Sequence, residues 1–419
     1  MSKNKKWLYL PVEIKVRELD AKLLMAYYAA KEGYSVVTGD HILVEMASTE
    51  LPAGIFFSKG YPHGFRKRVI LKAKENGHVV VELDEEGLLI NDKKYLRDRM
   101  KRDMLQLVTQ EYCWGPFQQN IITSANPDLR ARCHVTGNPR IDLLKPKYRS
   151  IYEEDAEQLR NDYGEFILIN TRFSLYNTPK GQKDNPHFRH IKQLYYSFME
   201  MTKATCERFP EINFVIRPHP GENFESYRHA LAEYTNGHVI HEGNIIKWLM
   251  AAKAVIHNGC TSGIETFLLE KPLISYVPSN SNTKEDTIPN QLGVKAVNIE
   301  EVHNAINDVY RREESNYNVK YRDQNINGLS YYCDWSNEGF AYDAILGLWD
   351  SIQISSPRVN TSLNKNVLRI KSKKKRKRRF SLTETEIQDF FNKLDKIEET
   401  LSRIIITKLA NNLYKIEGG

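Results

Sequence analysis

The sequence predicts an α/β protein with two domains, each built around a parallel, doubly wound sheet. Short apolar stretches, of which 79–83 and 166–169 are the clearest, alternate along the chain with longer stretches that are apolar at every third or fourth position. Strands that alternate with helices in this way are typical of βα units. The 419 residues suffice for two ordinary domains and an appendage, and the hydrophobic content of 41% is that of a packed globular protein.

The first domain is expected to span 1–150. Its charged stretch 13–20 is predicted to be a turn, and Gly33 and Gly77 are expected to close two of its helices. A linker is expected at 146–150. The expected strands are 7–12, 34–38, 54–58, 79–83 and the start of 133–142, and the expected helices are 21–31, 42–49 and 65–76.

The second domain is expected to span 151–355. The stretch 174–186 holds glycine and prolines with few apolar side chains, which indicates a mobile lid or an acceptor loop. The stretch 329–352 is expected to cross back towards the first domain. The expected strands are 166–169, 214–216, 239–241, 254–257 and 273–276, and the expected helices are 153–162, 190–209, the one after Gly263, and 302–312.

A third segment, 356–419, differs in composition. Ten Lys or Arg residues and no acid lie between Lys365 and Arg379, so most of the net charge of +7 belongs to this tail and not to the folded body. A capping box at Ser381 and Glu384 then predicts an amphipathic helix. Its apolar residues are Ile387, Phe390, Leu394, Ile397, Leu401 and Ile404.

This tail predicts a partner. A basic run beside an amphipathic helix is typical of a segment that binds an anionic membrane surface, here over 365–413. The helix is short for a coiled coil but sufficient for docking or for a homo-oligomer contact. Nucleic acid is the rival partner, which would make the protein a nucleic-acid-binding or scaffold protein.

The cysteines indicate a reducing compartment. Five cysteines are scattered singly, without a C-x-x-C pair, which argues against a disulfide framework and a zinc ribbon. The basic N-terminus is followed by a stretch interrupted by Pro11, Glu13 and Lys15, so it is a poor signal peptide. No run approaches eighteen apolar residues. We therefore expect a cytoplasmic protein, peripheral on the inner face of the plasma membrane if the tail binds lipid.

Two polar turns follow strands of the second domain, and both suit a phosphate. The strand 214–216 ends at Arg217-Pro218-His219-Pro220, where the two prolines force the chain out of the sheet. The strand 254–257 ends at Asn258, before Thr261, Ser262 and a helix whose N-terminus would face the same edge. Because parallel strands end at one edge, we expect these residues to bind an anionic phosphate ester, with Glu265 on a ribose diol.

Further polar side chains are expected at the same edges. Asn170 and Arg172 follow a strand of the second domain, and the turn from Gly243 to Trp248 could bracket a nucleobase, although Trp248 also suits a core position. In the first domain, the Gly-Asn-Pro turn with Asn138 and Arg140 follows a strand. An ordinary β-turn remains an alternative for it.

An acidic turn follows the strand 79–83. Asp84, Glu85, Glu86 and Gly87 place three carboxylates at the end of a strand, and carboxylates that lie together raise one another's pKa, which yields a base near neutral pH. The alternative is a solvated acidic turn. Neither Asp-x-Asp nor G-x-G-x-x-G occurs, so no metal site and no dinucleotide cofactor is expected.

Five strings together resemble a known family. They are PVEIKVRE at 11–18, DEEG at 84–87, TGNPRID at 136–142, RPHP at 217–220, and the Thr261-Ser262 turn with Glu265. Over residues 7 to about 350 the chain resembles two-domain GT-B glycosyltransferases, specifically bacterial surface carbohydrate biosynthesis proteins related to Kdo and sialic acid transferases. The resemblance implies two Rossmann-like domains that face a cleft, with an acceptor side in the first and a donor side in the second.

The resemblance also implies roles. Glu86 or Glu85 would deprotonate an acceptor hydroxyl, His219 would stabilise the leaving phosphate of a CMP-sugar, and Thr261 and Ser262 would bind that phosphate. Other expected donor-side residues are Asn170, Arg172, Arg217, Pro220, Gly243, Asn258 and Glu265, and expected acceptor-side residues are Glu13, Arg17, Glu18, Asn138 and Arg140.

The implied function is the transfer of a sugar, Kdo or a related ulosonic acid, from a CMP donor to a surface polysaccharide or glycolipid, without a metal or cofactor. The two phosphate turns are also similar to those of CDP-glycerol glycerophosphotransferases, which lose CMP as well. UDP-GlcNAc 2-epimerases share the Thr-Gly-Asn-Pro string, so that string alone does not separate the three activities.

Overall fold

The structure is a computed structural model that describes residues 6–60, 63–183, 185–278, 287–311, 328–335, 339–354 and 380–419. The chain divides into two units, which we treat separately. Unit 1 comprises Met1–Leu143 and Leu329–Gly419, and unit 2 comprises Leu144–Gly328. The expected boundary at 150 therefore lies at 143, and the stretch after 328 returns to unit 1, as expected for 329–352.

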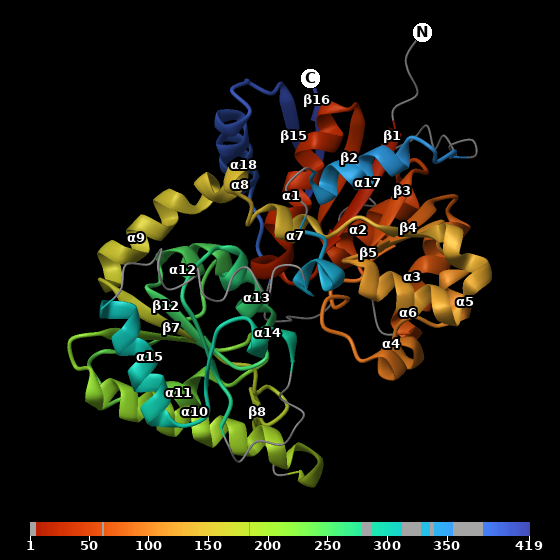
Figure 1. Cartoon of the computed structure of the whole chain (residues 1–419). Coiled ribbons are helices and arrows are strands. Elements are labelled where there is room, and N and C mark those ends of the chain that lie inside the picture. The colour runs from red at the N-terminus through yellow and green to blue at the C-terminus, as the bar shows by residue number, and fades with distance from the viewer. Residues whose placement is uncertain are drawn as a thin grey trace. The chain divides into compact units, whose positions relative to one another are not determined.

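Unit 1 is built on an eight-stranded sheet, shown with its helices in Figure 1. Its strands are β1 (Lys6–Val12), β2 (Tyr34–Asp40), β3 (Ile55–Ser58), β4 (Val79–Leu83), β5 (Gln110–Cys113), β6 (Cys133–Val135), β15 (Ile404–Ala410) and β16 (Leu413–Gly418). Its helices are α1 (Lys15–Lys31), α2 (His41–Glu50), α3 (His63–Glu75), α4 (Asp92–Asp98), α5 (Arg102–Leu105), α6 (Pro116–Ala125), α7 (Pro139–Asp142), α17 (Ala341–Trp349) and α18 (Glu384–Ile397), with the 3-10 helix η1 (Pro127–Arg132).

The sheet order is β15-β16-β2-β1-β3-β4-β5-β6, and β1 to β6 are parallel. Counted in chain order, the parallel strands follow the order 2-1-3-4-5-6, in which the winding reverses between β1 and β3. The alternation of apolar strands and helices thus predicted the doubly wound sheet correctly. Residues 13–20 are not a turn, however, because α1 begins at Lys15 and the Glu18 carboxylate accepts the Glu13 amide at 2.9 Å.

The C-terminal segment folds onto unit 1. The helix expected there ends at Ile397; Leu401 is 92% exposed, and Ile404 opens a hairpin whose second strand pairs antiparallel with β2. Gly39 permits this pairing, because a Cβ at its φ of +143° would lie 2.0 Å from the Asn412 carbonyl oxygen. The hairpin went unpredicted, although the run Ile404–Ala410 before an Asn-Asn turn is typical of one.

Helix α18 docks against α1. Its apolar residues Ile387, Phe390, Phe391 and Leu394 are buried, and the Phe391 ring lies 5.5 Å from that of Tyr27. Docking was one of the two roles expected for this helix. The other, a homo-oligomer contact, stays a prediction; the four buried residues of the stripe already pack within unit 1. The membrane segment expected over 365–413 is likewise folded into unit 1 from residue 380, and its basic run lies outside the described residues.

Unit 2 holds a six-stranded parallel sheet in the order β11-β10-β7-β12-β13-β14 (Figure 1). Its strands are β7 (Phe166–Asn170), β10 (Asn213–Arg217), β11 (Gly237–Val239), β12 (Ala254–His257), β13 (Leu273–Tyr276) and β14 (Val294–Ala296), with a separate hairpin of β8 (Asn177–Thr178) and β9 (Gly181–Gln182). Its helices are α8 (Pro146–Arg149), α9 (Glu153–Tyr163), α10 (Arg189–Arg208), α11 (Phe224–Ala230), α12 (Ile245–Ala251), α13 (Thr261–Leu268), α14 (Ile288–Gln291) and α15 (Ile299–Arg311), with the 3-10 helices η2 (Ser150–Tyr152) and η3 (Pro186–Phe188).

In chain order this sheet reads 3-2-1-4-5-6, the order of dinucleotide-binding sheets, and the winding reverses between β7 and β12. Side chains of α10, α11 and α15 pack with the strands in one core cluster. The turn expected at Gly243–Trp248 is mostly helix, since α12 begins at Ile245 and Trp248 is buried, as its core alternative required. The sequence therefore located every strand of this sheet except β14.

Candidate functional site

The candidate donor-side residues of unit 2 gather where the winding of its sheet reverses. In open α/β sheets, ligands bind outside the carboxyl ends of the strands at this point. Arg217 ends β10 and is paired with Asn170 at the end of β7. The Asn170 amide in turn donates to Ser262 Oγ at 3.1 Å, at the start of α13. Three loops that are distant in sequence therefore meet at one edge.

Arg217 is a buried cation with an unpaired donor. Its side chain donates to the Gly243 carbonyl at 2.6 Å, yet among the described residues its Nε has no hydrogen-bond partner. Burial lowers the pKa of Arg217 to about 10, and nearby Glu265 acts in the opposite direction, so the guanidinium stays charged at neutral pH. A buried polar group without a partner is rare in folded proteins, and a cationic one suits an anionic ligand.

His219 is exposed and held in one orientation. Its Nδ1 accepts the Gly221 amide at 3.1 Å, so in the neutral ring the proton lies on Nε2, which becomes a donor. The buried Glu222 fixes this turn by accepting the His219 amide at 3.1 Å and the Thr171 hydroxyl at 2.8 Å. Burial raises the pKa of Glu222, and hydrogen bonds from Tyr227 and Thr171 oppose that rise. The sequence did not predict that Glu222, Thr171 and Tyr227 hold this turn. Thr171 and Tyr227 lie outside the turn, so no local pattern connects them with it.

The second turn is built by Arg172. Its guanidinium donates to the Asn258 carbonyl at 2.5 Å and to the Asn258 side chain at 2.9 Å. The Gly259 amide then donates to the side chain of Asn290 at 2.6 Å. Arg172 and Asn258 are thus engaged with each other, and their role as direct ligand contacts stays a prediction.

Helix α13 begins at Thr261, three residues before the predicted start after Gly263. Its N-cap residue, Cys260, makes no side-chain capping bond, so the first amides of the helix point to the strand edge without a side-chain cap. Glu265, expected in the first turn, is the fifth residue of α13 and is buried. Position 263 of α13 requires glycine, because a Cβ there would lie 2.4 Å from Cε1 of the buried His257.

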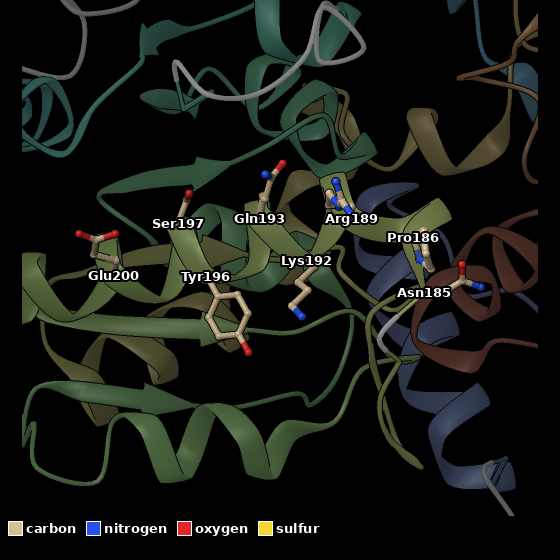
Figure 2. Close-up of a pocket in the computed structure, with 8 residues that line it drawn as sticks. All are labelled: Asn185, Pro186, Arg189, Lys192, Gln193, Tyr196, Ser197 and Glu200. Atoms are coloured by element: carbon tan, nitrogen blue, oxygen red, sulfur yellow. The ribbon is translucent and has the colours of Figure 1, made fainter.

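Pro220, Gly243 and the loop 174–186 are the remaining features expected at the site of unit 2. Pro220 is exposed in the His-Pro turn, and Gly243 contributes the carbonyl that Arg217 contacts. The lid or acceptor loop expected at 174–186 contains the β8–β9 hairpin, and its end lines a hollow of about 760 Å³ along α10 (Figure 2). None of the expected site residues lines this hollow, which is formed by Asn185, Pro186, Arg189, Lys192, Gln193, Tyr196, Ser197 and Glu200.

The candidate residues of unit 1 also gather at the reversal of their sheet, between β1 and β3. Lys59, which follows β3, donates to Glu13 at 2.8 Å and to Glu18 at 2.7 Å. Arg17 on α1 donates to Glu86 at 2.5 Å and lies 3.4 Å from Glu18. Glu86 of the acidic turn after β4 therefore contacts Arg17 of the PVEIKVRE string at 11–18. Lys59 and Lys22, which complete this cluster, were not predicted, since single lysines carry no signal in the sequence.

The three carboxylates of the acidic turn have different environments. Asp84 is buried and bonded through both oxygens to Arg99 at 2.6 and 2.8 Å, which makes it structural. Glu85 is buried against Lys22, with their charged atoms 3.2 Å apart. The Glu86 side chain is 53% exposed.

The expected upward pKa shift from clustered carboxylates is wrong for Glu85. Burial raises the pKa of its carboxyl, but Lys22, Arg140, Lys59 and Arg17 together outweigh burial and hold that pKa below its ordinary value. Cations, not carboxylates, dominate this turn. Glu85 is therefore an ionised acceptor of hydrogen bonds, and the acidic turn is not a loosely solvated one at this residue.

Asn138 and Arg140 lie beside this cluster. Asn138 caps α7 by accepting the Arg140 amide at 2.9 Å, and the Arg140 guanidinium lies 5.7 Å from the centre of the Trp114 ring. The turn also holds α17, since Asp142 accepts two amides of that helix, from Ala341 at 2.9 Å and Tyr342 at 3.0 Å. Asp142 therefore has a structural role, as the ordinary-turn alternative implies. Arg140, in contrast, lowers the pKa of the Glu85 carboxyl.

Within the described residues, no group of His, Cys, Asp and Glu could hold a metal ion. Across the same part of the chain, no helix combines the length and the apolar character that crossing a bilayer requires.

The sequence matches no protein-family model and no curated protein. Solved structures do resemble the fold. One UDP-N-acetylglucosamine 2-epimerase aligns with a TM-score of 0.54 and 13% identity over 85% of this chain and 99% of its own. The UDP-GlcNAc 2-epimerase from Neisseria meningitidis aligns with a TM-score of 0.52 and 13% identity over 83% and 100%.

The wall teichoic acid polymerase TagF aligns with a TM-score of 0.53 and 12% identity over 83% of this chain and 88% of its own. At these identities the likeness concerns the fold alone. The chain is therefore an α/β protein of the GT-B fold class, with one Rossmann-like sheet in each unit.

Proposed function

We propose that this protein is a glycosyltransferase in which unit 2 binds a nucleotide-activated donor and unit 1 binds the hydroxyl acceptor. The observation that carries the proposal is the buried Arg217, whose Nε has no partner among the described residues, at the carboxyl end of β10 beside β7, the strand at which the winding of the unit 2 sheet reverses. His219 and the start of α13 follow the strands on either side. Together they offer a cation, an imidazole donor and backbone amides to one anion.

The chemistry of such a transfer is mainly electrostatic. When the bond from the sugar to the phosphate breaks, negative charge grows on the leaving phosphate. Arg217 would neutralise part of this charge, while the Nε2 proton of His219 and the Ser262 hydroxyl would donate to the phosphate oxygens. Ser262 Oγ already accepts from Asn170, so its own proton is available for this bond.

Glu86 is the better candidate for the base. It is exposed to substrate and bonded to Arg17, whereas Glu85 is buried and ionised. Glu86 would take the proton of the acceptor hydroxyl as that oxygen attacks the donor sugar. Glu85 would hold the acceptor in place.

The finer proposal is a CMP donor that carries Kdo or a related ulosonic acid, with a surface polysaccharide or glycolipid as acceptor. The DEEG string at 84–87 and the PVEIK start at 11–15 support it. The similar structures leave the nucleotide open, since one is of an epimerase bound to UDP-GlcNAc and another is of TagF soaked with CDPG. A CDP-glycerol-type glycerophosphotransferase is the second candidate, favoured by the fold likeness to TagF and by the shared loss of CMP.

Calorimetry with CMP, CDP and UDP tests the donor class. We expect CMP and CDP to bind and UDP to bind more weakly; a preference for UDP would point to epimerase-like or hexose-transfer chemistry. His219→Ala and Glu86→Ala, assayed separately, should each lower the transfer rate about 100-fold or more with the fold retained. Full activity of either variant would remove that residue from the mechanism.

The place of action follows from the same proposal. A donor made in the cytoplasm and a lipid-linked acceptor put the enzyme on the inner face of the plasma membrane, where the basic run 365–379 would meet anionic lipid. The competing possibility is a nucleic-acid-binding or scaffold protein, in which the same run contacts RNA.

A further inference from the structure

The charged cluster of unit 1 contains buried polar atoms without partners. Glu85 is 5% exposed, and its Oε2 accepts no hydrogen bond within the described ranges. The Nε of Arg17 and the Nδ2 of Asn138 are likewise buried and unpaired there. One acceptor and two donors, on the segments that follow β4, β1 and β6 of one sheet, are therefore unpaired within the described residues.

The cations of this cluster already contact carboxylates. Lys22 lies 3.2 Å from Glu85, Lys59 donates to Glu13 and Glu18, and Arg17 donates to Glu86. A substrate carboxylate or phosphate would have to displace one of these carboxylates and would also face the ionised Glu85. An anion is therefore disfavoured, in contrast to the site of unit 2.

A positively charged ligand is disfavoured as well. Although Glu85 Oε2 needs a donor, Lys22, Arg140, Lys59 and Arg17 all act on this carboxylate. A substrate ammonium group at Glu85 would add a further positive charge beside them. The ligand must therefore offer a donor without a charge.

A hydroxyl group is uncharged and can both donate and accept. We propose that this position takes the uncharged hydroxyl groups of a neutral sugar or polyol, which donate to Glu85 Oε2 and accept from Arg17 Nε and Asn138 Nδ2. The inference rests on the proposed function and deepens it, because it names the chemical class of the acceptor: a neutral terminal sugar, and not a uronic acid, a phosphorylated sugar or an amino sugar.

The test is binding of the full chain, without nucleotide, to an array of neutral, acidic and amino-sugar glycans. We expect the bound glycans to end in uncharged sugars. Glu85→Gln should lower their affinity about tenfold, since it replaces an ionised acceptor with an amide. Binding mainly to acidic or amino-sugar termini, or to no glycan, would overturn the inference.

Two further variants keep this test decisive. Glu85→Gln leaves Lys22 buried without its partner and could unfold the protein. The double variant Lys22→Met with Glu85→Gln removes both charges, and it should fold yet still bind about tenfold more weakly; unchanged binding would contradict the inference. Asp98→Asn, an exposed carboxylate that pairs with Arg97, is the matched control and should bind like the wild type.

Failure here is distinguishable from failure of the proposed function. Calorimetry with CMP on the same preparations reports on unit 2 alone. Neutral glycan binding without any nucleotide binding would remove the donor proposal and leave this inference standing. Nucleotide binding together with a preference for charged glycans would do the reverse.

Discussion

At the scale of single residues, Arg217 is the side chain on which the donor proposal depends. Its guanidinium is buried and charged, holds the Gly243 carbonyl, and leaves Nε without a partner in the described structure. The sequence predicted Arg217 as a phosphate contact from the abrupt end of a strand at two prolines. It could not predict the burial, which depends on the loop at Gly243.

Arg217→Lys tests this contact. Lysine keeps the charge but has no Nε donor and no planar fork, so the affinity for CMP should fall about 10- to 100-fold, or about 1.4 to 2.8 kcal/mol. Calorimetry measures the change. Arg228→Lys on α11, whose side chain is 53% exposed and paired with Glu225, is the matched control and should leave CMP binding unchanged. Equal affinities for both variants would exclude Arg217 from the donor site.

Glu111 gives a pH-dependent prediction. It is buried with Glu82 and the shared partner Arg66, and burial first, then Glu82, raises the pKa of Glu111 well above its ordinary value of 4.5. A raised folded pKa gives a stabilising contribution that is complete below the unfolded pKa and is lost as pH rises through the folded value.

Glu111→Gln keeps the shape and removes the titrating proton. The stability of this variant relative to the wild type should therefore increase between pH 5 and pH 9, as followed by urea denaturation at several pH values. A difference that stays constant with pH would show that Glu111 does not titrate in this range in the folded protein.

At the scale of elements, the apolar alternation located the strands well, because a buried parallel strand needs a continuous apolar run. The apolar alternation gave wrong predictions where charge and tertiary contacts determine the secondary structure. Residues 15–20 are helical because the Glu18 carboxylate accepts the Glu13 amide just before α1, and because Glu18 and Arg17 pair with Lys59 and Glu86 across the sheet edge. No local pattern contains those partners.

The C-terminal hairpin is the other failure at this scale. The apolar residues 387, 390, 394, 397, 401 and 404 continue with helical spacing, but only the part that α1 can cover becomes helix. Beyond Ile397, pairing with β2 supplies the backbone hydrogen bonds, and the chain becomes a strand.

Gly39→Ala tests the hairpin. The added Cβ would lie 2.0 Å from the Asn412 carbonyl oxygen at a φ of +143°, so we expect a loss of about 2 kcal/mol or more and earlier proteolysis of the C-terminal segment. Gly64→Ala in α3 is the control, because nothing lies within 4 Å of its Cβ position. Thermal denaturation and mass spectrometry of the fragments measure both, and equal stability of the two variants would contradict this role of Gly39.

At the scale of the whole molecule, Phe380 is held at a defined place in unit 1. The Asn412 side chain donates to the Phe380 carbonyl at 3.3 Å, and the Asn412 carbonyl accepts the Asp40 amide at 2.9 Å. Asp40 ends β2, so residue 380 is anchored at the carboxyl edge of the sheet of unit 1, where the candidate acceptor residues also lie.

Replacing the Lys and Arg residues of 371–379 with Gln tests the membrane contact proposed for the basic run. Each cation near an anionic bilayer contributes about 1 kcal/mol, so co-sedimentation with phosphatidylserine vesicles should be lost, while binding to CMP is retained. Salt-sensitive RNA binding that disappears in the same variant, with no effect on vesicles, would favour the nucleic-acid alternative.

The proposed transfer needs residues of both units. The expected base and the expected phosphate contacts belong to different units. That they face a single cleft stays a prediction, which transfer assays of the His219 and Glu86 variants address directly.

By itself the sequence determined the two doubly wound sheets and the strand ends that carry Arg217, His219 and the acidic turn, because these depend on local apolar runs and on prolines and glycines beside them. Only the tertiary structure decided which of these side chains are buried, that Glu85 is surrounded by Lys22 and other cations, and that the last forty residues complete unit 1. Burial and ion pairing join residues far apart in the chain, and for that reason no local pattern could contain them.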